Sequence, residues 1–285
     1  MALDNNNFET DPSPAVRINK YLSACGLCSR READRLIESG QILINGIRAS
    51  AGQKVFPEDK VTLADGQELT LYDKLILIAY NKPRGIECTS DKDTKNNIYD
   101  AINYPERIFP IGRLDKNSSG LILLTNDGSI SDKILRSSNY HEKEYEVVTD
   151  KAISDDFLDK MRNGVRIVLD DDAHLRKIKA ANGQASGRRR HTEVQAAACE
   201  TAEKSRGIVV KTRPCKVTKT GEKNFNIVLT QGLNKQIRRM CGALGYKVVS
   251  LKRIRIMNIY LGDLKEGTYR DLTEEEISEL KRLLK

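Results

Sequence analysis

Asp115 stands in the stretch IGRLDKNSSGLILLTNDG, which runs from Ile111 to Gly128. Arg113 precedes the carboxylate by two residues, and small, turn-forming residues follow it before an apolar run begins at Leu121. An aspartate in this setting is commonly a turn or cap residue, because its side chain accepts hydrogen bonds from nearby backbone N–H groups. It can also be a carboxylate that takes part in chemistry, and the choice depends on which other groups accompany it.

Two other stretches carry groups that could act with such a carboxylate. Tyr145 begins a predicted strand in KEYEVV, where a phenol is commonly a half-buried residue of a sheet. From Asn234 to Ile256 the chain has seven basic residues and no acidic one. A helix is predicted over 235–244, and its basic side chains either face water or bind phosphate groups; the lack of a local acid favours phosphate. These side chains are those of Lys235, Arg238 and Arg239.

Helices and strands must position these residues, and the chain of 285 residues is long enough to form them around a substantial core. Hydrophobic residues make up 39% of the chain. Lysine and arginine (48) exceed aspartate and glutamate (40) by 8, and the isoelectric point is about 9.1. An excess of this size favours a polyanionic partner such as nucleic acid. The chain has no apolar run of about 18 residues and no signal-like start, so we expect a cytoplasmic protein that does not bind membranes, and a monomer.

Six cysteines are scattered along the chain, and only Cys25 and Cys28 form a C-x-x-C pair. A zinc site would need a second such pair or two suitably spaced histidines, and the histidines at 141, 174 and 191 do not provide them. The sequence therefore predicts reduced thiols and no metal site.

Residues 15–73 are predicted to form a small module of their own. Ser29 and Glu32 form a capping box that starts a helix, Gly40 ends it, and Asn45-Gly46 is typical of a type I′ hairpin. Acidic and basic residues cancel over this module, so its basic side chains either form a solvated face or bind RNA through their placement. The candidates for RNA contact are Arg17, Lys20, Arg30, Arg31 and Arg35.

Residues 74–285 are predicted to form a larger α+β domain, and residues 1–14 a disordered polar tail. Short strands mixed with helices, without regular βαβ alternation, indicate a mixed, largely antiparallel sheet flanked by helices. One buried strand is predicted before the turn Asn-Lys-Pro-Arg-Gly, and helices are predicted to start after Ser154 and Thr273. Residues 169–206 have few aliphatic and no aromatic side chains, so we expect a mobile surface insertion there.

The motifs resemble two known families. The patterns N-K-Y-L-S, S-R-R-E-A-D-R-L-I and I-L-I-N-G are similar to the S4 RNA-binding domain, a small module of two helices on a short sheet. The motifs G-R-L-D-K-x-S-x-G-L, K-E-Y and G-x-N-x-Q-I-R-R-M resemble the RsuA/RluB/E/F group of pseudouridine synthases, which carry an S4 domain ahead of the catalytic domain. The likeness covers residues 15–280 apart from the insertion, and departs at Lys235, where relatives often have arginine or histidine. It implies an enzyme that converts uridine in RNA to pseudouridine without cofactor or metal.

In that group the aspartate of the first motif is the nucleophile, a role that the resemblance assigns to Asp115. It assigns to Arg238 an ion pair that keeps this carboxylate ionised in a dry cleft, where burial alone would favour the protonated form. Tyr145 would pack against the target base and handle the proton removed from C5. The base must be flipped out of its stack, and Arg113 would fill the space that it leaves. The implied partner is RNA, with 23S rRNA favoured and tRNA as the alternative.

Two other function classes stay open on the residues alone. A non-catalytic S4-type RNA-binding or ribosome-assembly protein would be expected to lack Asp115, Tyr145 or Arg238, and all three are present. A nucleoside hydrolase with an aspartate nucleophile would be expected to show a second carboxylate near the first, as acid and base. An assay of base isomerisation separates these alternatives.

Overall fold

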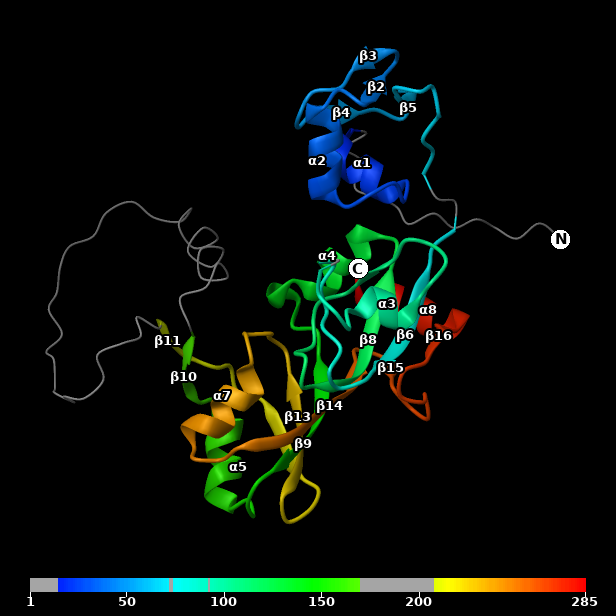
Figure 1. The fold of residues 1–285 in the computed structure, drawn as a ribbon. Coiled ribbons are helices and arrows are strands. Elements are labelled where there is room, and N and C mark those ends of the chain that lie inside the picture. The colour runs from blue at the N-terminus through cyan, green and yellow to red at the C-terminus, as the bar shows by residue number, and fades with distance from the viewer. Residues whose placement is uncertain (1–14, 72–73, 92, 170–207) are drawn as a thin grey trace, which may run out of the picture. The chain divides into compact units, whose positions relative to one another are not determined.

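The computed structural model describes residues 15–71, 74–91, 93–169 and 208–285 (Figure 1). The predicted tail and the predicted insertion beyond Leu169 lie outside the described residues. The chain divides into two compact units: the first falls within residues 1–116, 120–136 and 263–285, and the second within residues 117–119 and 137–262. The predicted domain boundary at residue 73 stays a prediction.

The N-terminal part of the first unit is a small module with its own core. Its elements are β1 (Val16–Arg17), α1 (Ile18–Ala24), α2 (Arg30–Glu38), β2 (Ile42–Ile44), β3 (Ile47–Arg48), β4 (Lys54–Val55) and β5 (Val61–Leu63). The strands β3, β2 and β5 form one antiparallel sheet, and β1 pairs with β4. Every side chain of this core lies between Ile18 and Leu69, and Ile18, Leu22, Ala33 and Ile42 have no exposed surface. The module therefore has the apolar cluster that it needs to fold by itself.

Local signals set the ends of these elements. Ser29 caps α2 by accepting from the backbone N–H of Glu32, whereas the Glu32 carboxylate pairs with Arg35 at 2.7 Å and not with the start of the helix. The predicted capping box is therefore only half formed. Asn45 and Gly46 both have positive φ, 52° and 81°, as the predicted type I′ hairpin requires.

The rest of the first unit is built on two strands that are buried on both faces. Its elements are β6 (Leu77–Lys82), α3 (Ile98–Ile102), β7 (Phe109–Pro110), β8 (Ser119–Thr125), α4 (Gly128–Leu135), β16 (Tyr269–Asp271) and α8 (Glu274–Leu283). β6 lies between β8 and β16 (Figure 1) and is antiparallel to both. β7 pairs with β8. All six residues of β6 are buried, and Leu121 to Leu124 of β8 have no exposed surface. This burial agrees with the apolar runs that the sequence shows at residues 75–80 and 121–124.

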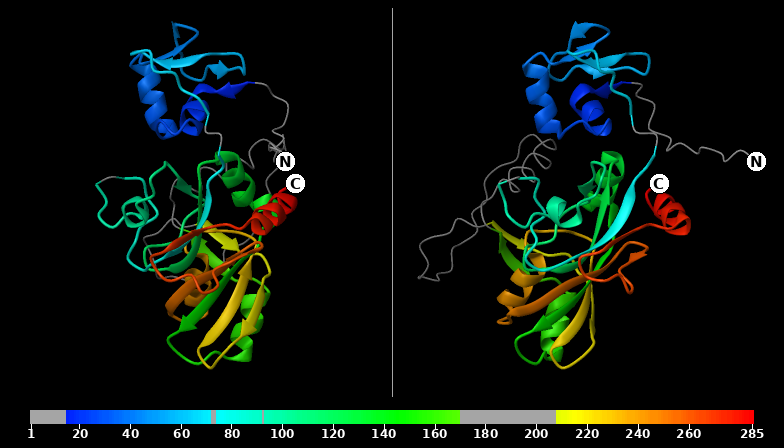
Figure 2. Two further views of the ribbon diagram at one scale, coloured as in Figure 1. Left: turned by 90° about the vertical axis from the view of Figure 1, so that its right-hand side faces the viewer. Right: turned by 45° about the vertical axis from the view of Figure 1, so that its right-hand side comes forward.

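The second unit is an antiparallel sheet with helices against one face. Its elements are η1 (Ser137–Asn139), β9 (Lys143–Thr149), α5 (Asp155–Arg162), β10 (Arg166–Leu169), β11 (Ile208–Lys211), β12 (Lys216–Lys219), β13 (Asn224–Leu229), α7 (Gln236–Ala243), β14 (Val248–Ile256) and β15 (Ile259–Tyr260). The strand order is β12-β13-β9-β14, and the helices α5 and α7 share a core with these strands (Figure 2). The predicted α+β class with a mixed, largely antiparallel sheet is confirmed.

The predicted helix over 235–244 starts one residue later than expected. Lys235 has a left-handed backbone, with φ of 49°, and precedes α7 as its N-cap residue without a capping side-chain bond. Ser154 and Thr273 cap α5 and α8 as predicted, and the capping box between Thr273 and Glu276 is complete.

The segment predicted as an insertion is flanked by two strands that the sequence analysis did not predict. β10 and β11 pair antiparallel, with Leu169 opposite Ile208, so the described ends of the segment lie side by side. A turn of a few residues can join strands in this register. Replacing residues 170–207 by a short glycine-serine turn is therefore expected to leave the melting temperature and the turnover nearly unchanged. A drop in melting temperature of more than a few degrees in thermal unfolding would contradict this.

Candidate active site

The loop that carries Asp115, residues 112–116 (the Asp115 loop), alternates between buried and exposed side chains. Gly112 adopts a positive φ of 78°, which turns the chain, and Arg113 then points its side chain into solvent. Leu114 is 7% exposed, and its backbone N–H donates to Cys88 Sγ at 3.4 Å. Asp115 is half-buried and Lys116 is exposed. The buried side chain of Leu114 therefore anchors the loop directly before Asp115, and Asp115 itself keeps part of its surface exposed.

A second anchor holds the other side of the same loop. The N–H of Gly85 donates to the carbonyl of Lys116 at 2.8 Å, and Lys116 Nζ pairs with Glu87 at 2.8 Å. Gly85 belongs to the Asn-Lys-Pro-Arg-Gly turn, which is closed by Lys82: its Nζ donates to the carbonyls of Pro83, at 2.7 Å, and Ile86, at 2.8 Å. Leu114 and Lys116, the two neighbours of Asp115 in the chain, are thus both anchored.

Lys82 is a site-supporting residue that the sequence analysis missed. Its side chain has no exposed surface, which is rare for lysine, and the carbonyl oxygens around its ammonium group make this burial tolerable. The sequence did hold a sign that this lysine is buried: it ends a predicted buried apolar strand and directly precedes a proline.

Arg238 holds the segment that follows the Asp115 loop. From α7, its Nη1 donates to the carbonyl of Val248 at 3.1 Å, and its Nη2 donates to the carbonyl of Asn117 at 3.0 Å and to Ser118 Oγ at 3.4 Å. Asn117 and Ser118 belong with the second unit, as Arg238 does, whereas Asp115 belongs to the first. The resemblance implies an ion pair between Arg238 and Asp115. Because the two residues belong to different units, this ion pair stays a prediction.

Tyr145 lies on β9 with a partly buried ring that packs against the core of the second unit. Its neighbours across the sheet are Ile227 on β13 and Arg253 on β14. Arg253 is 3% exposed, and the sequence analysis had counted it only as one charge of a cationic stretch. Lys143, two residues before the tyrosine, was missed altogether. The signal available for both was their position in period-two strands beside buried aliphatic residues.

The predicted RNA contacts differ in how freely they face solvent. The five predicted contacts of the first module are all exposed: Arg17, Lys20, Arg30, Arg31 and Arg35. Arg35 is nevertheless paired with Glu32. Lys235 is exposed as well. Arg239 donates to the carbonyls of Asn234 and Val168, so it also holds the start of α7 against β10. Its contact with RNA stays a prediction.

The described cysteines are buried or partly buried thiols in no disulfide. Burial raises the pKa of Cys25 and of Cys215 to about 11 and that of Cys241 to about 12. Thiols with such pKa values hold their protons at neutral pH and are poor nucleophiles.

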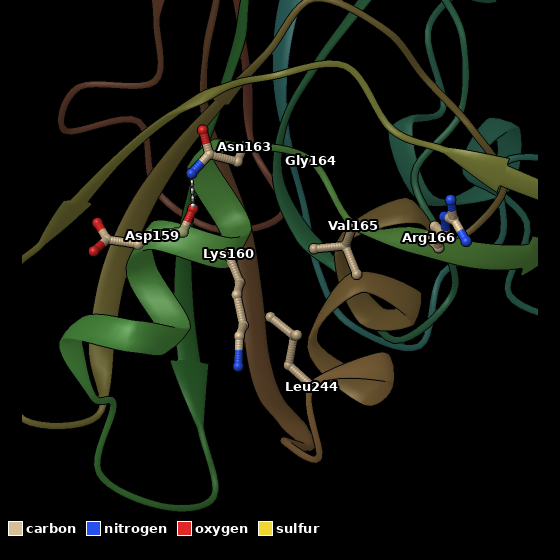
Figure 3. A pocket seen from close by; sticks show the side chains of 7 residues that line it. All are labelled: Asp159, Lys160, Asn163, Gly164, Val165, Arg166 and Leu244. Carbon is tan, nitrogen blue, oxygen red and sulfur yellow. Dashed lines mark hydrogen bonds between the residues drawn. The ribbon is translucent and has the colours of Figure 1, made fainter.

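The second unit also has a surface hollow that is separate from the predicted site residues. It is formed where α5 ends and β10 begins, with Lys160, Val165, Arg166 and Leu244 in its wall (Figure 3). No predicted site residue lines it, and it offers mixed charges with a small apolar patch. We assign it no part in the chemistry.

Comparison with known proteins decides the family. The sequence model of the RNA pseudouridylate synthase family matches residues 76–243, more than half of the chain, and that of the S4 domain matches residues 16–61. The chain belongs to the RNA pseudouridine synthase family. A solved structure described as a pseudouridylate synthase aligns over 93% of this chain and 99% of its own, with 27% identity and a TM-score of 0.58.

Two curated relatives place the chain within this family. The dual-specificity RNA pseudouridine synthase RluF of Escherichia coli strain K12 is 43% identical over 275 residues, which cover 96% of this chain and 81% of the relative. The ribosomal large subunit pseudouridine synthase B of Bacillus subtilis is 27% identical over 270 residues, covering 94% and 96%. The predicted resemblance to the RsuA/RluB/E/F group is confirmed. No helix within the described ranges is long and apolar enough to span a membrane.

Proposed function

We propose that this pseudouridine synthase isomerises a uridine of 23S rRNA, and that Asp115 is its nucleophile. The observation that carries the proposal is the double anchoring of the Asp115 loop, through Leu114 on one side and Lys116 on the other. These anchors use backbone groups and neighbouring side chains, so the carboxylate itself is left available for substrate.

The isomerisation needs a carboxylate that reaches the target nucleotide. The N1–C1′ bond breaks, the base rotates, and a C5–C1′ bond forms, while C5 loses a proton and N1 regains one. A covalent bond from Asp115 to C1′ or to C6 of the uracil would hold the intermediate during this rotation. Excluding water prevents hydrolysis of the same bond.

The remaining groups have complementary roles in the proposal. Tyr145 packs against the uracil and handles the C5 proton, and its partly buried ring at the edge of a core suits stacking. Arg238 keeps Asp115 ionised. Arg113 is exposed and two residues from the nucleophile, where it can fill the space of the flipped base.

Tritium release tests the reaction. RNA labelled with tritium at C5 of uracil is expected to lose tritium to water in the presence of the protein, while the chain length and the number of glycosidic bonds stay constant. Release of free uracil would instead indicate a hydrolase. Binding of RNA without tritium release would indicate a protein that only binds.

A second substrate class is favoured by one relative. The name of the Escherichia coli relative states dual specificity but names no second RNA. We infer that a tRNA, the alternative from the sequence analysis, can serve beside the large-subunit rRNA. Mapping pseudouridines in RNA from cells that lack the gene identifies the targets. Loss of a site in tRNA alone would reverse the preference for 23S rRNA.

The basic face of the first module is expected to contribute to RNA affinity. Deleting residues 1–73 should weaken binding and flatten its dependence on salt, because each lost phosphate contact lowers the slope of log affinity against log salt by roughly 0.7 to 0.9. The rest of the protein should keep its melting transition, since the module has a separate core. Titration of RNA at several salt concentrations measures the slope. An unchanged slope would mean that the face is only solvated.

A further inference from the structure

Tyr140 has an unusual backbone conformation for an aromatic residue. It lies between η1 and β9, and its φ of 54° falls in the left-handed region, which bulky side chains rarely adopt. Of the other five non-glycine residues with positive φ in the described ranges, three are asparagines, which tolerate this conformation. A strained residue of this kind points to a use for its side chain.

The ring of Tyr140 is exposed and lies against an arginine. Tyr140 is 60% exposed. The guanidinium carbon of Arg213 lies 4.4 Å from the centre of the ring, within the range of a cation–π contact, and Arg213 itself is partly buried. The contact supports the ring on one side, while most of the residue stays open to solvent.

Tyr140 and Arg213 both lead into the same end of the sheet of the second unit. Tyr140 comes three residues before Lys143, where β9 starts, and Arg213 comes three residues before Lys216, where β12 starts. These two starting residues lie opposite the last two residues of β13. Segments that are distant in the chain therefore place the ring and the guanidinium group together at this end.

The same end of the sheet carries Tyr145, the third residue of β9. Tyr140 precedes Tyr145 by five residues, and five residues of extended chain span at most about 18 Å. A nucleotide close to the one that packs on Tyr145 is therefore within reach of Tyr140.

The charges near this ring suit an RNA strand. The segment 208–221, which contains Arg213, has four basic residues and no acidic one. Glu142 is the acidic residue nearest to Tyr140 in the chain, and it pairs with Arg255 at 2.8 Å. Proteins bind unpaired RNA by combining a cationic path for the backbone with aromatic rings on which bases stack.

We propose that Tyr140, supported by Arg213, is a stacking platform for an unpaired base of the RNA near the target uridine. The inference rests on the proposed function, because the RNA substrate supplies the base. When the uridine flips out, its neighbours lose a stacking partner, and the ring of Tyr140 replaces it for one of them. Stacking tolerates any base, so the platform adds affinity and orients the strand.

Two substitutions in an Asp115→Asn background separate the ring from the fold, with an RNA hairpin that has uridine in an unpaired loop as the probe. Tyr140→Phe keeps the ring and should keep the affinity. Tyr140→Asn removes the ring and suits a left-handed backbone, so its melting temperature should not fall, whereas its affinity should fall at least about fivefold. The slope of log affinity against log salt should stay unchanged, because no charge is removed. Unchanged affinity in Tyr140→Asn would overturn the platform.

Tyr260→Asn is the matched control. Tyr260 is 59% exposed, and the guanidinium carbon of Arg255 lies 5.7 Å from the centre of its ring. Arg255 also pairs with Glu142 and Glu144, whose charges disfavour a polyanion. This variant should therefore bind the hairpin as the unaltered chain does. Equal losses of affinity in the two asparagine variants would contradict a specific platform.

Fluorescence gives an independent readout of stacking. A hairpin with 2-aminopurine in place of one loop base beside the uridine should lose fluorescence on binding to the protein with Tyr140 or with Tyr140→Phe, and much less with Tyr140→Asn. Equal quenching by all three would overturn the platform. The difference should persist when a short turn replaces residues 170–207, and its disappearance would assign the effect to that segment instead. None of these measurements needs turnover, so they are separate from the proposed function, which fails if the unaltered protein releases no tritium.

Discussion

An Asp115→Asn variant is expected to release tritium from C5-labelled RNA at less than about one-thousandth of the rate of the unaltered protein, because the amide cannot act as the nucleophile. The loop should keep its conformation. Its anchors are the N–H of Leu114 and the carbonyl of Lys116, and neither involves the carboxylate. RNA affinity should therefore persist, and titration of the same RNA measures it.

Asp127→Asn is the matched control for this substitution. Asp127 caps α4 by accepting from the backbone N–H of Ser129 at 2.7 Å, and asparagine is an equally good cap residue. This variant should keep full turnover and nearly the same melting temperature. Turnover above a trace in Asp115→Asn would remove this aspartate from the role of nucleophile.

An Arg238→Ala variant is expected to lose both activity and stability. The substitution removes the donor for the carbonyls of Val248 and Asn117 and for Ser118 Oγ, and Ser118 is only 1% exposed. Leaving such acceptors without their charged donor should lower the free energy of unfolding by about 3 kcal/mol. Turnover should fall by at least about 100-fold, since the segment after Asp115 loses its support and the predicted ion pair is lost. Denaturant unfolding and tritium release measure the two effects.

Two further variants separate the roles of Arg238. Arg238→Lys keeps the charge but cannot span both carbonyls with one planar fork, so it should recover little activity if positioning dominates. Ser118→Ala removes only the weakest of the three bonds and should cost less than a tenfold loss of turnover. Full activity in Arg238→Ala would show that another cation serves Asp115.

Local signals in the sequence determined many of the elements. Ser154 and Thr273 mark helix starts because a cap residue acts on N–H groups only two or three residues away. Asn45 and Gly46 specify their hairpin because few residues adopt two successive left-handed conformations. Each of these properties is local, so the sequence alone was enough.

The candidate site could be predicted partly from the sequence and partly only from the tertiary structure. The motif residues Asp115, Tyr145 and Arg238 could be singled out from the sequence, because the resemblance is carried by short patterns. The sequence alone did not show that Arg238 bonds to the segment after Asp115, since the two are far apart in the chain. The strands β10 and β11 were missed because each is short and lies beside a polar segment, and only their pairing identifies them.

Only the tertiary structure decided the environment of the charged side chains. Lys82 and Arg253 look like solvated cations in the sequence, yet one closes a turn that anchors the Asp115 loop and the other lies buried beside Tyr145. A bulge between Arg253 and Arg255 sends two arginines of one strand to opposite faces, and strand alternation read from the sequence would have placed them together. Burial and register arise from contacts between distant segments, and these contacts determine which charges are structural and which can meet a substrate.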